Sequence, residues 1–280
     1  MNKNLLVLSA LPLVLSIASC AVEPPASSQT NPAEISRVAQ GQPFTYDDYA
    51  SVLTTYVDSQ GQVDYAALQE NRESLDRFNA DLAALDRDTY ESWTETEQIA
   101  FWVNAYNSLT LQAIIDNYPV ESIKDISGVW TRLNFIVLGE SMTLDHIEHG
   151  ILREEFNEPR IHMGLVCASI GCPLLRAEPF VGDRLATQLD EQTVEFLEYS
   201  RNFQIDRDTG EVGISSIFKW FGEDWKTNYG VEEKFDGFKG EKRAVLNFIA
   251  QYLEEGDRQY LTDGGYKLNY LDYDWGLNAQ

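Results

Sequence analysis

The chain has 280 residues, of which 44% are hydrophobic and 12% aromatic, so it can build a sizeable core. Its 45 acidic residues outnumber 21 basic ones and give a net charge of −24 at pH 7. Such a surface repels phosphate backbones and anionic lipid, which argues against nucleic-acid binding and against charge-driven membrane binding. The excess acid indicates either a surface kept hydrated in a salty medium or a cationic partner.

The first twenty residues are typical of a secretory signal. Lys3 precedes an apolar stretch at 5–18, which is too short to span a membrane. Residues 17–20 resemble a bacterial lipobox, in which cleavage leaves the cysteine acylated. We therefore expect a signal peptide at 1–19 and a lipidated Cys20 as the membrane anchor, since two or more acyl chains anchor stably. Ordinary cleavage nearby, with Cys20 as a free thiol, is the alternative.

The residues after the expected cleavage site predict location and domain limits. Ala21, in place of Asp, favours the outer membrane, facing the periplasm, by resemblance to lipoprotein sorting. Residues 20–42 are rich in Pro, Ser and Gln, and we expect a disordered tether. No comparable break follows, so residues 43–280 are expected to form a single globular domain.

Within that domain, helical and strand patterns alternate irregularly, which predicts an α+β fold. We expect a single domain with a buried central helix and a small, mainly antiparallel sheet. Helices are predicted at about 45–57, from 65, and at 75–85, 97–118, 145–156, 183–199 and 242–253, with hairpins at 133–143 and 203–214, an extended run at 160–167 and a closing strand at 266–273.

The predicted helix at 97–118 follows a capping box at 94–97 and stops before Pro119. It is apolar almost all round, which predicts a buried helix. Asn104 and Asn107 lie one turn apart on it, and buried amides need hydrogen-bond partners. Those partners are either the backbone of a neighbouring loop or a ligand.

All three histidines fall within the seventeen residues from His146 to His162. His146, His149 and Arg153 share a face of the predicted helix at 145–156. Glu148 is three residues after the start of this helix, so it either completes an N-terminal cap or orients a catalytic imidazole. His162 lies on the extended run that ends at a cysteine.

Cys167 and Cys172 close this region, and three interpretations fit them. They form a disulfide in an oxidising compartment, or Cys167 is a nucleophile activated by an imidazole, or both bind zinc with a histidine. Their spacing matches no standard zinc pattern, and we predict no metal and no cofactor. We expect His149, His162 and Cys167 to converge, with Glu148 near an imidazole.

If the site is catalytic, Cys167 attacks, His149 or His162 is the base, and Glu148 orients the ring. The expected substrate-binding residues, which include two oxyanion donors on the central helix, are Asn104, Asn107, Arg153 and Arg160. No GxSxG, HExxH or phosphate-binding glycine loop is present, which argues against serine α/β-hydrolases, zincins and P-loop enzymes.

Several blocks follow one another along the chain: Val57–Tyr65, Phe101–Asn107, Leu144–Arg153, Arg160–His162, Cys167–Pro173 and Tyr273–Asn278. In this order they resemble signature blocks of the domain of unknown function 547 family. The resemblance covers nearly all the chain after the signal. It implies no settled activity, transfers no catalytic residue, and supports the domain limits and the lipoprotein setting.

A weaker analogy is with papain-like and transglutaminase-like folds, in which a cysteine opens the buried helix. The helix at 97–118 has no cysteine, so the analogy concerns architecture only. We expect an envelope-anchored binding or structural module facing the periplasm, with a protein or small molecule as its partner. The alternative is a cysteine-type hydrolase or acyltransferase acting on peptide or amide bonds.

Overall fold

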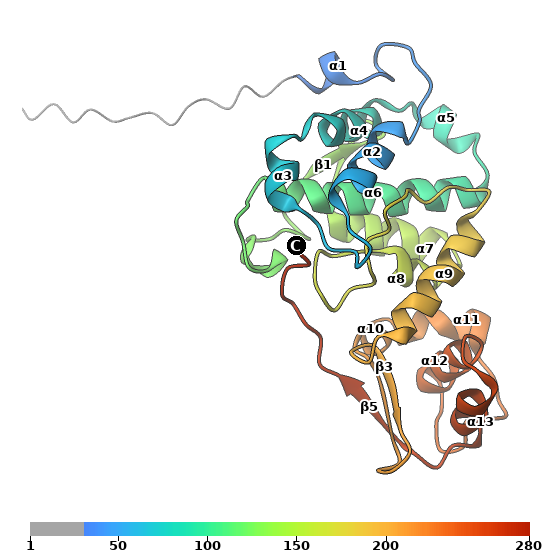
Figure 1. The fold of residues 1–280 in the computed structure, drawn as a ribbon. Coiled ribbons are helices and arrows are strands. Elements are labelled where there is room, and N and C mark those ends of the chain that lie inside the picture. The colour runs from blue at the N-terminus through green and yellow to red at the C-terminus, as the bar shows by residue number, and fades with distance from the viewer. Residues whose placement is uncertain (1–30) are drawn as a thin grey trace, which may run out of the picture. The chain divides into compact units, whose positions relative to one another are not determined.

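Helix α6 (Glu95–Ile115) is the central element of the computed structural model, which describes residues 31–280 (Figure 1). Its capping box forms as predicted: Glu97 N–H donates to the Thr94 hydroxyl, and Thr94 N–H donates to the Glu97 carboxylate. Sixteen of its 21 residues are buried, because other helices pack on several of its sides. The predicted buried central helix is confirmed.

About half of the described residues are helical. The other α-helices are α1 (Pro32–Ile35), α2 (Asp47–Tyr56), α3 (Tyr65–Glu70), α4 (Glu73–Ala84), α5 (Arg87–Glu91), α7 (Arg153–Glu155), α8 (Ile161–Gly164), α9 (Leu185–Glu198), α10 (Ile217–Trp220), α11 (Lys226–Tyr229), α12 (Glu241–Ala250) and α13 (Glu255–Asp263). Three further short helical segments are η1 (Ile123–Asp125), the π-helix η2 (His146–Leu152) and η3 (Gly222–Trp225).

Two small sheets complete a mixed α+β fold, as predicted. Strands β1 (Phe135–Val137) and β2 (Glu140–Met142) form an antiparallel hairpin. In the second sheet, β4 (Glu211–Ser215) pairs antiparallel with β3 (Phe203–Asp206) and parallel with β5 (Lys267–Leu271). Both predicted hairpins and the closing strand are therefore confirmed, although the parallel pair makes the second sheet mixed.

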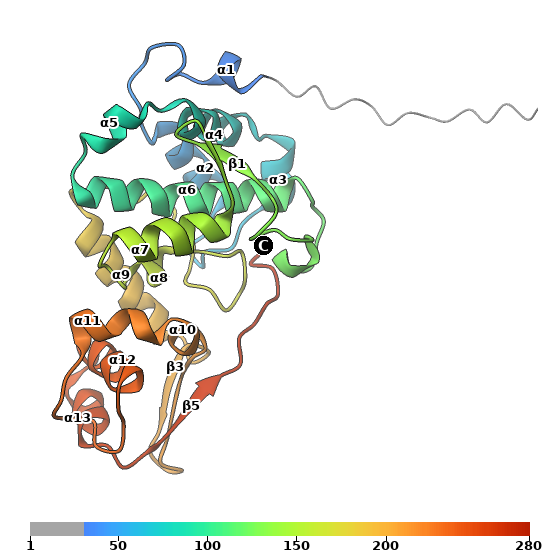
Figure 2. The ribbon, with the colours of Figure 1, turned by 180° about the vertical axis from the view of Figure 1, so that it is seen from behind.

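The buried apolar side chains form two clusters. The larger surrounds α6, with α2, α3 and α4 on one side of it and η2, α8 and α9 on the other (Figures 1 and 2). The smaller lies among β4, α10, α12 and α13. Within residues 31–280, which form one compact unit, no helix is both long and apolar enough to cross a membrane.

Residues 272–280 run from β5 back to the larger cluster, so that the C-terminus lies beside α3 (Figure 2). Ser169 forms a bridge with Leu277, and Val63 forms another with Ala279. The buried Asn278 side chain accepts a hydrogen bond from Tyr65 at 2.7 Å. These contacts fix the late segment against elements more than a hundred residues earlier.

The extended run predicted at 160–167 is wrong, because residues Ile161–Gly164 form one helical turn, α8. All four residues of this turn are buried. A segment that is buried on all sides shows no alternation of polar and apolar residues, because none of its faces is exposed. Its hydrophobic pattern therefore could not distinguish a strand from a helix. The predicted helix at 145–156 is likewise modified, since its first part is the wider η2.

The expected tether is also wrong for residues 31–42, which pack on α4. Ser36 is fully buried, and its hydroxyl donates to Asp81 at 2.7 Å. The same carboxylate accepts a hydrogen bond from Val38 N–H at 3.0 Å. This buried, charge-assisted contact stabilises a segment whose composition alone predicts disorder. The signal peptide, Cys20 and the remainder of the tether lie outside the described residues.

Candidate functional site

A cavity of about 230 Å³ lies where η2, α8, α10 and residues 272–280 meet beside α6. One part of its wall is aromatic and the other carries thiols, imidazoles and carboxylates. We call it the aromatic cavity. Its lining residues are Tyr106, Trp130, Asp145, Glu148, His149, His162, Leu165, Cys167, Cys172, Ile217, Trp220, Phe221, Tyr273 and Trp275.

The two thiols lie side by side at this wall, on residues 167–173, which we call the thiol loop. Both are free. Cys167 N–H donates to the Cys172 sulfur at 2.9 Å. The hydroxyl of Tyr273 is hydrogen-bonded to the Cys167 sulfur at 3.1 Å and to the Cys172 sulfur at 2.9 Å. The disulfide alternative is therefore not the state in this structure, although the two side chains share one partner.

Their surroundings make the two thiols chemically different. The hydrogen bond from Cys172, supported by hydrogen bonds with Tyr273 and Ser169, outweighs burial and lowers the pKa of Cys167. Burial instead raises the pKa of Cys172. A low pKa increases the thiolate fraction at neutral pH, and the thiolate is the reactive form. Cys167 is therefore the more readily ionised of the pair.

His162 is held rigidly in the same wall. Its ring is 3% exposed and stacks on Phe221 at a centroid distance of 4.1 Å. Nε2 lies 2.8 Å from Oδ2 of Asp224, and a carboxylate accepts, so Nε2 carries a proton. Within residues 31–280, Nδ1 of His162 has no hydrogen-bond partner. In the neutral ring this nitrogen is free to accept a proton.

Asp224 contacts His162 directly and is linked to His149 through Arg153. The guanidinium donates to the two Asp224 oxygens at 2.6 and 2.8 Å. A third nitrogen of Arg153 lies 2.8 Å from Nδ1 of His149. Arginine only donates, so this His149 nitrogen accepts and Nε2 carries the proton. Burial would raise the pKa of Asp224, but the hydrogen bonds from Arg153 and His162 hold it well below its usual range.

The structure thus brings Cys167, His149, His162 and Glu148 to one cavity, as the sequence predicts. Their expected contacts differ, however. Within the described residues, no hydrogen bond joins Cys167 to an imidazole. Glu148 lies against Tyr106, whose pKa is raised by burial and then by this carboxylate. The catalytic role of the four residues stays a prediction.

Asn104 and Asn107 are buried and hydrogen-bonded, as predicted, but to the backbone. Asn104 donates to Phe180 O at 2.8 Å and accepts from Phe180 N–H at 3.0 Å. Asn107 donates to Gly164 O and accepts from Val166 N–H, both at 2.9 Å. Neither amide lines the aromatic cavity. Both amides bind neighbouring loops, so this geometry gives no support to the expected substrate-binding role, which stays a prediction.

The two arginines expected to bind substrate are also engaged within the protein, and their substrate-binding role likewise stays a prediction. Arg160 pairs with Glu158 at 2.5 Å and with Asp190 at 2.7 Å, away from the aromatic cavity. Arg153 lies behind His149 rather than at the wall. Both guanidinium groups are occupied by carboxylates of the protein. No group of three His, Cys, Asp or Glu side chains in the described part of the chain is arranged to hold a metal ion.

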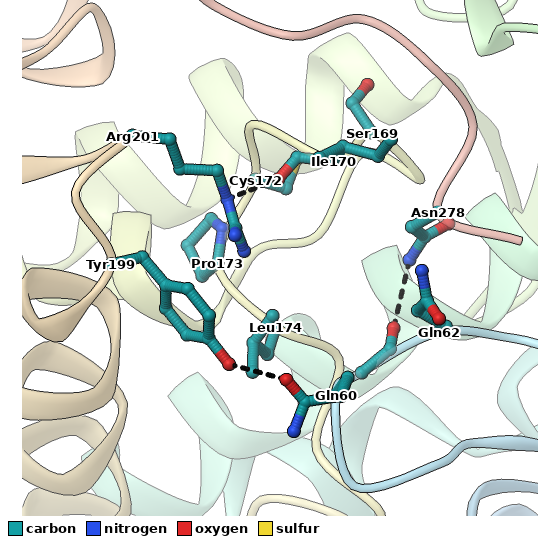
Figure 3. Close-up of a pocket in the computed structure, with 11 residues that line it drawn as sticks. Gln60, Gln62, Ser169, Ile170, Cys172, Pro173, Leu174, Tyr199, Arg201 and Asn278 are labelled. Carbon is teal, nitrogen blue, oxygen red and sulfur yellow. Dashed lines mark hydrogen bonds between the residues drawn. The ribbon is translucent and has the colours of Figure 1, made fainter.

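A second cavity of about 170 Å³ adjoins the thiol loop and shares Cys172 with the first (Figure 3). Its polar groups bond to one another: Tyr199 donates to Gln60 at 3.2 Å, and Arg201 donates to Ile170 O at 3.2 Å. These contacts engage Gln60, Tyr199 and Arg201 within the protein. The aromatic cavity holds the thiols and imidazoles that the sequence singles out, and we therefore treat it as the candidate functional site.

Sequence reasoning missed Asp224 and most of the aromatic wall. Asp224 is 62 residues from His162, with no motif to mark it. Trp220 and Phe221 belong to a stretch that the sequence analysis left unassigned, and Trp130 lies in a loop. The only available signal is the density of aromatic residues at 217–225 and 270–275, which does not show that these segments meet.

The fold and this cavity define a mixed α+β domain with paired thiols in an aromatic wall. Residues 90–197 of the chain match the model of the family described as "Protein of unknown function, DUF547". The match includes α6, η2 and the thiol loop, whereas Asp224 and Tyr273 lie beyond it. No curated protein and no solved structure matches the chain.

Asp224→Asn should lower the free energy of unfolding at pH 7 by about 2–4 kcal/mol, because it weakens the charge-assisted hydrogen bonds from Arg153 and His162. A carboxyl with a lowered pKa stabilises the fold above its unfolded pKa near 4 and loses this effect as the pH falls through its folded pKa. The free energy of unfolding, measured in urea, should therefore differ less between Asp224→Asn and wild type below about pH 4 than at pH 7.

The control is Asp208→Asn, on the exposed turn between β3 and β4. It should leave the free energy of unfolding unchanged both at pH 7 and below about pH 4. A wild-type advantage over Asp224→Asn that grows on acidification would contradict the arrangement described for Arg153 and His162.

Proposed function

We propose that the protein is an envelope lipoprotein, anchored through Cys20, whose globular part binds a small ligand in the aromatic cavity. One observation carries the binding proposal: a single cavity combines an apolar, aromatic wall with a few convergent polar groups. Ligand sites in proteins have this composition. The thiols are hydrogen-bonded to the Tyr273 hydroxyl rather than to an imidazole, which favours binding over catalysis.

Three of the six tryptophans line the aromatic cavity, so a bound ligand should change intrinsic fluorescence. We expect a screen of small cations, anions and neutral molecules to give saturable changes for at least one class. Trp220→Leu should reduce the response, and Trp93→Phe, which is outside the cavity, should keep it. If no class of compound gives a saturable change, the protein is a structural module.

The anchoring proposal rests on the signal and lipobox-like residues, and it places the protein in the outer membrane facing the periplasm. Wild-type protein should incorporate labelled palmitate and sediment with outer membranes. Cys20→Ala should abolish both and release the protein into the soluble periplasmic fraction. Cys172→Ala controls for the loss of a thiol and should stay membrane-bound. A soluble, unlabelled wild-type protein would refute the anchor.

A second candidate function is a cysteine-type hydrolase or acyltransferase acting on peptide or amide bonds. It is supported by the lowered pKa of Cys167 and by the free Nδ1 of His162 in the same cavity. In it, Nδ1 of His162 takes the Cys167 proton, the thiolate attacks the carbonyl carbon, and the C–N bond breaks as the amine leaves with that proton. Water or a second amine, losing a proton to His162, then takes the acyl group from the thioester and the Cys167 thiol is restored. His149 is the poorer base because Arg153 occupies its Nδ1.

The reactivity of the thiols tests this candidate. At pH 7, iodoacetamide should alkylate Cys167 well before Cys172, as read by peptide mass spectrometry. Tyr273→Phe should slow alkylation of Cys167, since it removes a hydroxyl that stabilises the thiolate, whereas Tyr199→Phe should not. Equal rates at both thiols, or natively exported protein with both sulfurs already joined, would eliminate Cys167 as a nucleophile.

A further inference from the structure

The charged groups at the wall of the aromatic cavity are acidic. Glu148 and Asp145 line it, and no lysine or arginine does. Within residues 31–280, Glu148 has no salt-bridge partner although it is partly buried. Asp145 has only a His149 nitrogen at 3.8 Å. Partly buried carboxylates usually have a hydrogen-bonding or cationic partner. Glu148 interacts with Tyr106 and, at longer range, with the Arg153 guanidinium, but it forms no ion pair within the described residues.

Four aromatic rings that line the same cavity form a continuous surface. Tyr273 lies 4.6 Å from Trp275 and 4.9 Å from Trp220 between ring centroids. Trp130 extends the surface at 6.1 Å from Trp275. Trp220 is 46% exposed, so part of its ring is open to solvent. Among aromatic side chains, the indole face attracts cations most strongly.

The protein already contains one contact of this kind between a cation and an indole. The ammonium of Lys124, which does not line the cavity, lies 4.7 Å from the ring centroid of Trp275. An anion would instead meet two carboxylates with no arginine or lysine to pair with. A bound cation is attracted both by the carboxylates and by the indole rings, whereas a neutral ligand interacts favourably with the aromatic wall only.

We propose that the ligand of the aromatic cavity is a small quaternary ammonium compound, an inference that rests on the proposed binding function. Primary ammonium groups bring three N–H donors that each need an acceptor. The wall is largely apolar, with few acceptors besides Glu148 and Asp145. A trimethylammonium group has no N–H to satisfy, presents methyl groups to the indoles and keeps its positive charge for the carboxylates.

The test compares choline with its neutral carbon isostere, 3,3-dimethylbutan-1-ol. Calorimetric titrations use the full chain in a maltoside detergent, which contains no ammonium group. Choline should bind at least about tenfold more tightly than the isostere. Glu148→Gln should weaken choline binding roughly tenfold and leave the isostere unchanged. The matched control is Glu155→Gln, an exposed acid close by in the sequence, and it should change neither.

Trp220→Leu separates cation attraction from apolar contact, because leucine keeps an apolar surface without a π face. It should weaken choline binding more than isostere binding. Vesicles of phosphatidylcholine, compared with phosphatidylglycerol, form a second arm. If the protein binds phosphatidylcholine vesicles but not free choline, the proposal is supported and the ligand is a lipid head group. If it binds free choline but not the vesicles, the proposal is supported and the ligand is a free solute.

Failure of the quaternary ammonium assignment can be distinguished from failure of the proposed ligand binding. If the isostere binds as tightly as choline, or if the fluorescence screen finds only anionic or neutral ligands, the quaternary ammonium assignment is overturned and ligand binding stands. If Glu148→Gln leaves choline binding unchanged, the assignment is also overturned. If no compound of any class binds, both fall. Circular dichroism of each variant checks that it is folded.

Discussion

The arrangement of the site depends on two buried amides of α6. Asn104 and Asn107 each donate to and accept from the backbone of a different loop, so they act like short β-pairings made by side chains. A buried backbone group without a partner is costly, which makes these contacts hard to exchange. Asn107 holds Val166, the residue before Cys167. The position of the thiol loop is therefore set from inside the core.

A second constraint joins the two apolar clusters. Asp224 belongs to η3, beside the smaller cluster, whereas Arg153 and His162 belong to the part of the chain packed on α6. Their hydrogen bonds cross the boundary where the aromatic cavity lies. The cavity thus forms between two separately packed regions, a common location for ligand sites, because side chains there need not fill all the space.

Local signals were sufficient for the elements that local chemistry determines. The capping box at Thr94, the break before Pro119 and the turn glycines of both hairpins each specify their own segment. The convergence of His149, His162 and Cys167 at one cavity also followed from their short separation along the chain. The contacts that each side chain makes there did not, since they depend on partners from distant segments.

The elements that sequence reasoning misjudged are those determined by distant partners. The helical turn α8 is buried among other elements, and residues 31–42 are ordered by Asp81. The partner of His162 is Asp224, and the acids at 145–148 face aromatic residues more than seventy positions further on. A single sequence contains no signal for such long-range pairs, because each residue type is compatible with many partners.

The return of residues 272–280 to the larger cluster has a kinetic consequence. Bridges between Val63 and Ala279 and between Ser169 and Leu277 close loops of more than a hundred residues. Contacts of such high sequence separation form slowly, because the entropy of loop closure must be overcome first. Until Tyr273 and Trp275 arrive, the thiol loop lacks its outer wall. During folding, therefore, Cys167 and Cys172 pass through an interval in which oxidants and other thiols have access to them.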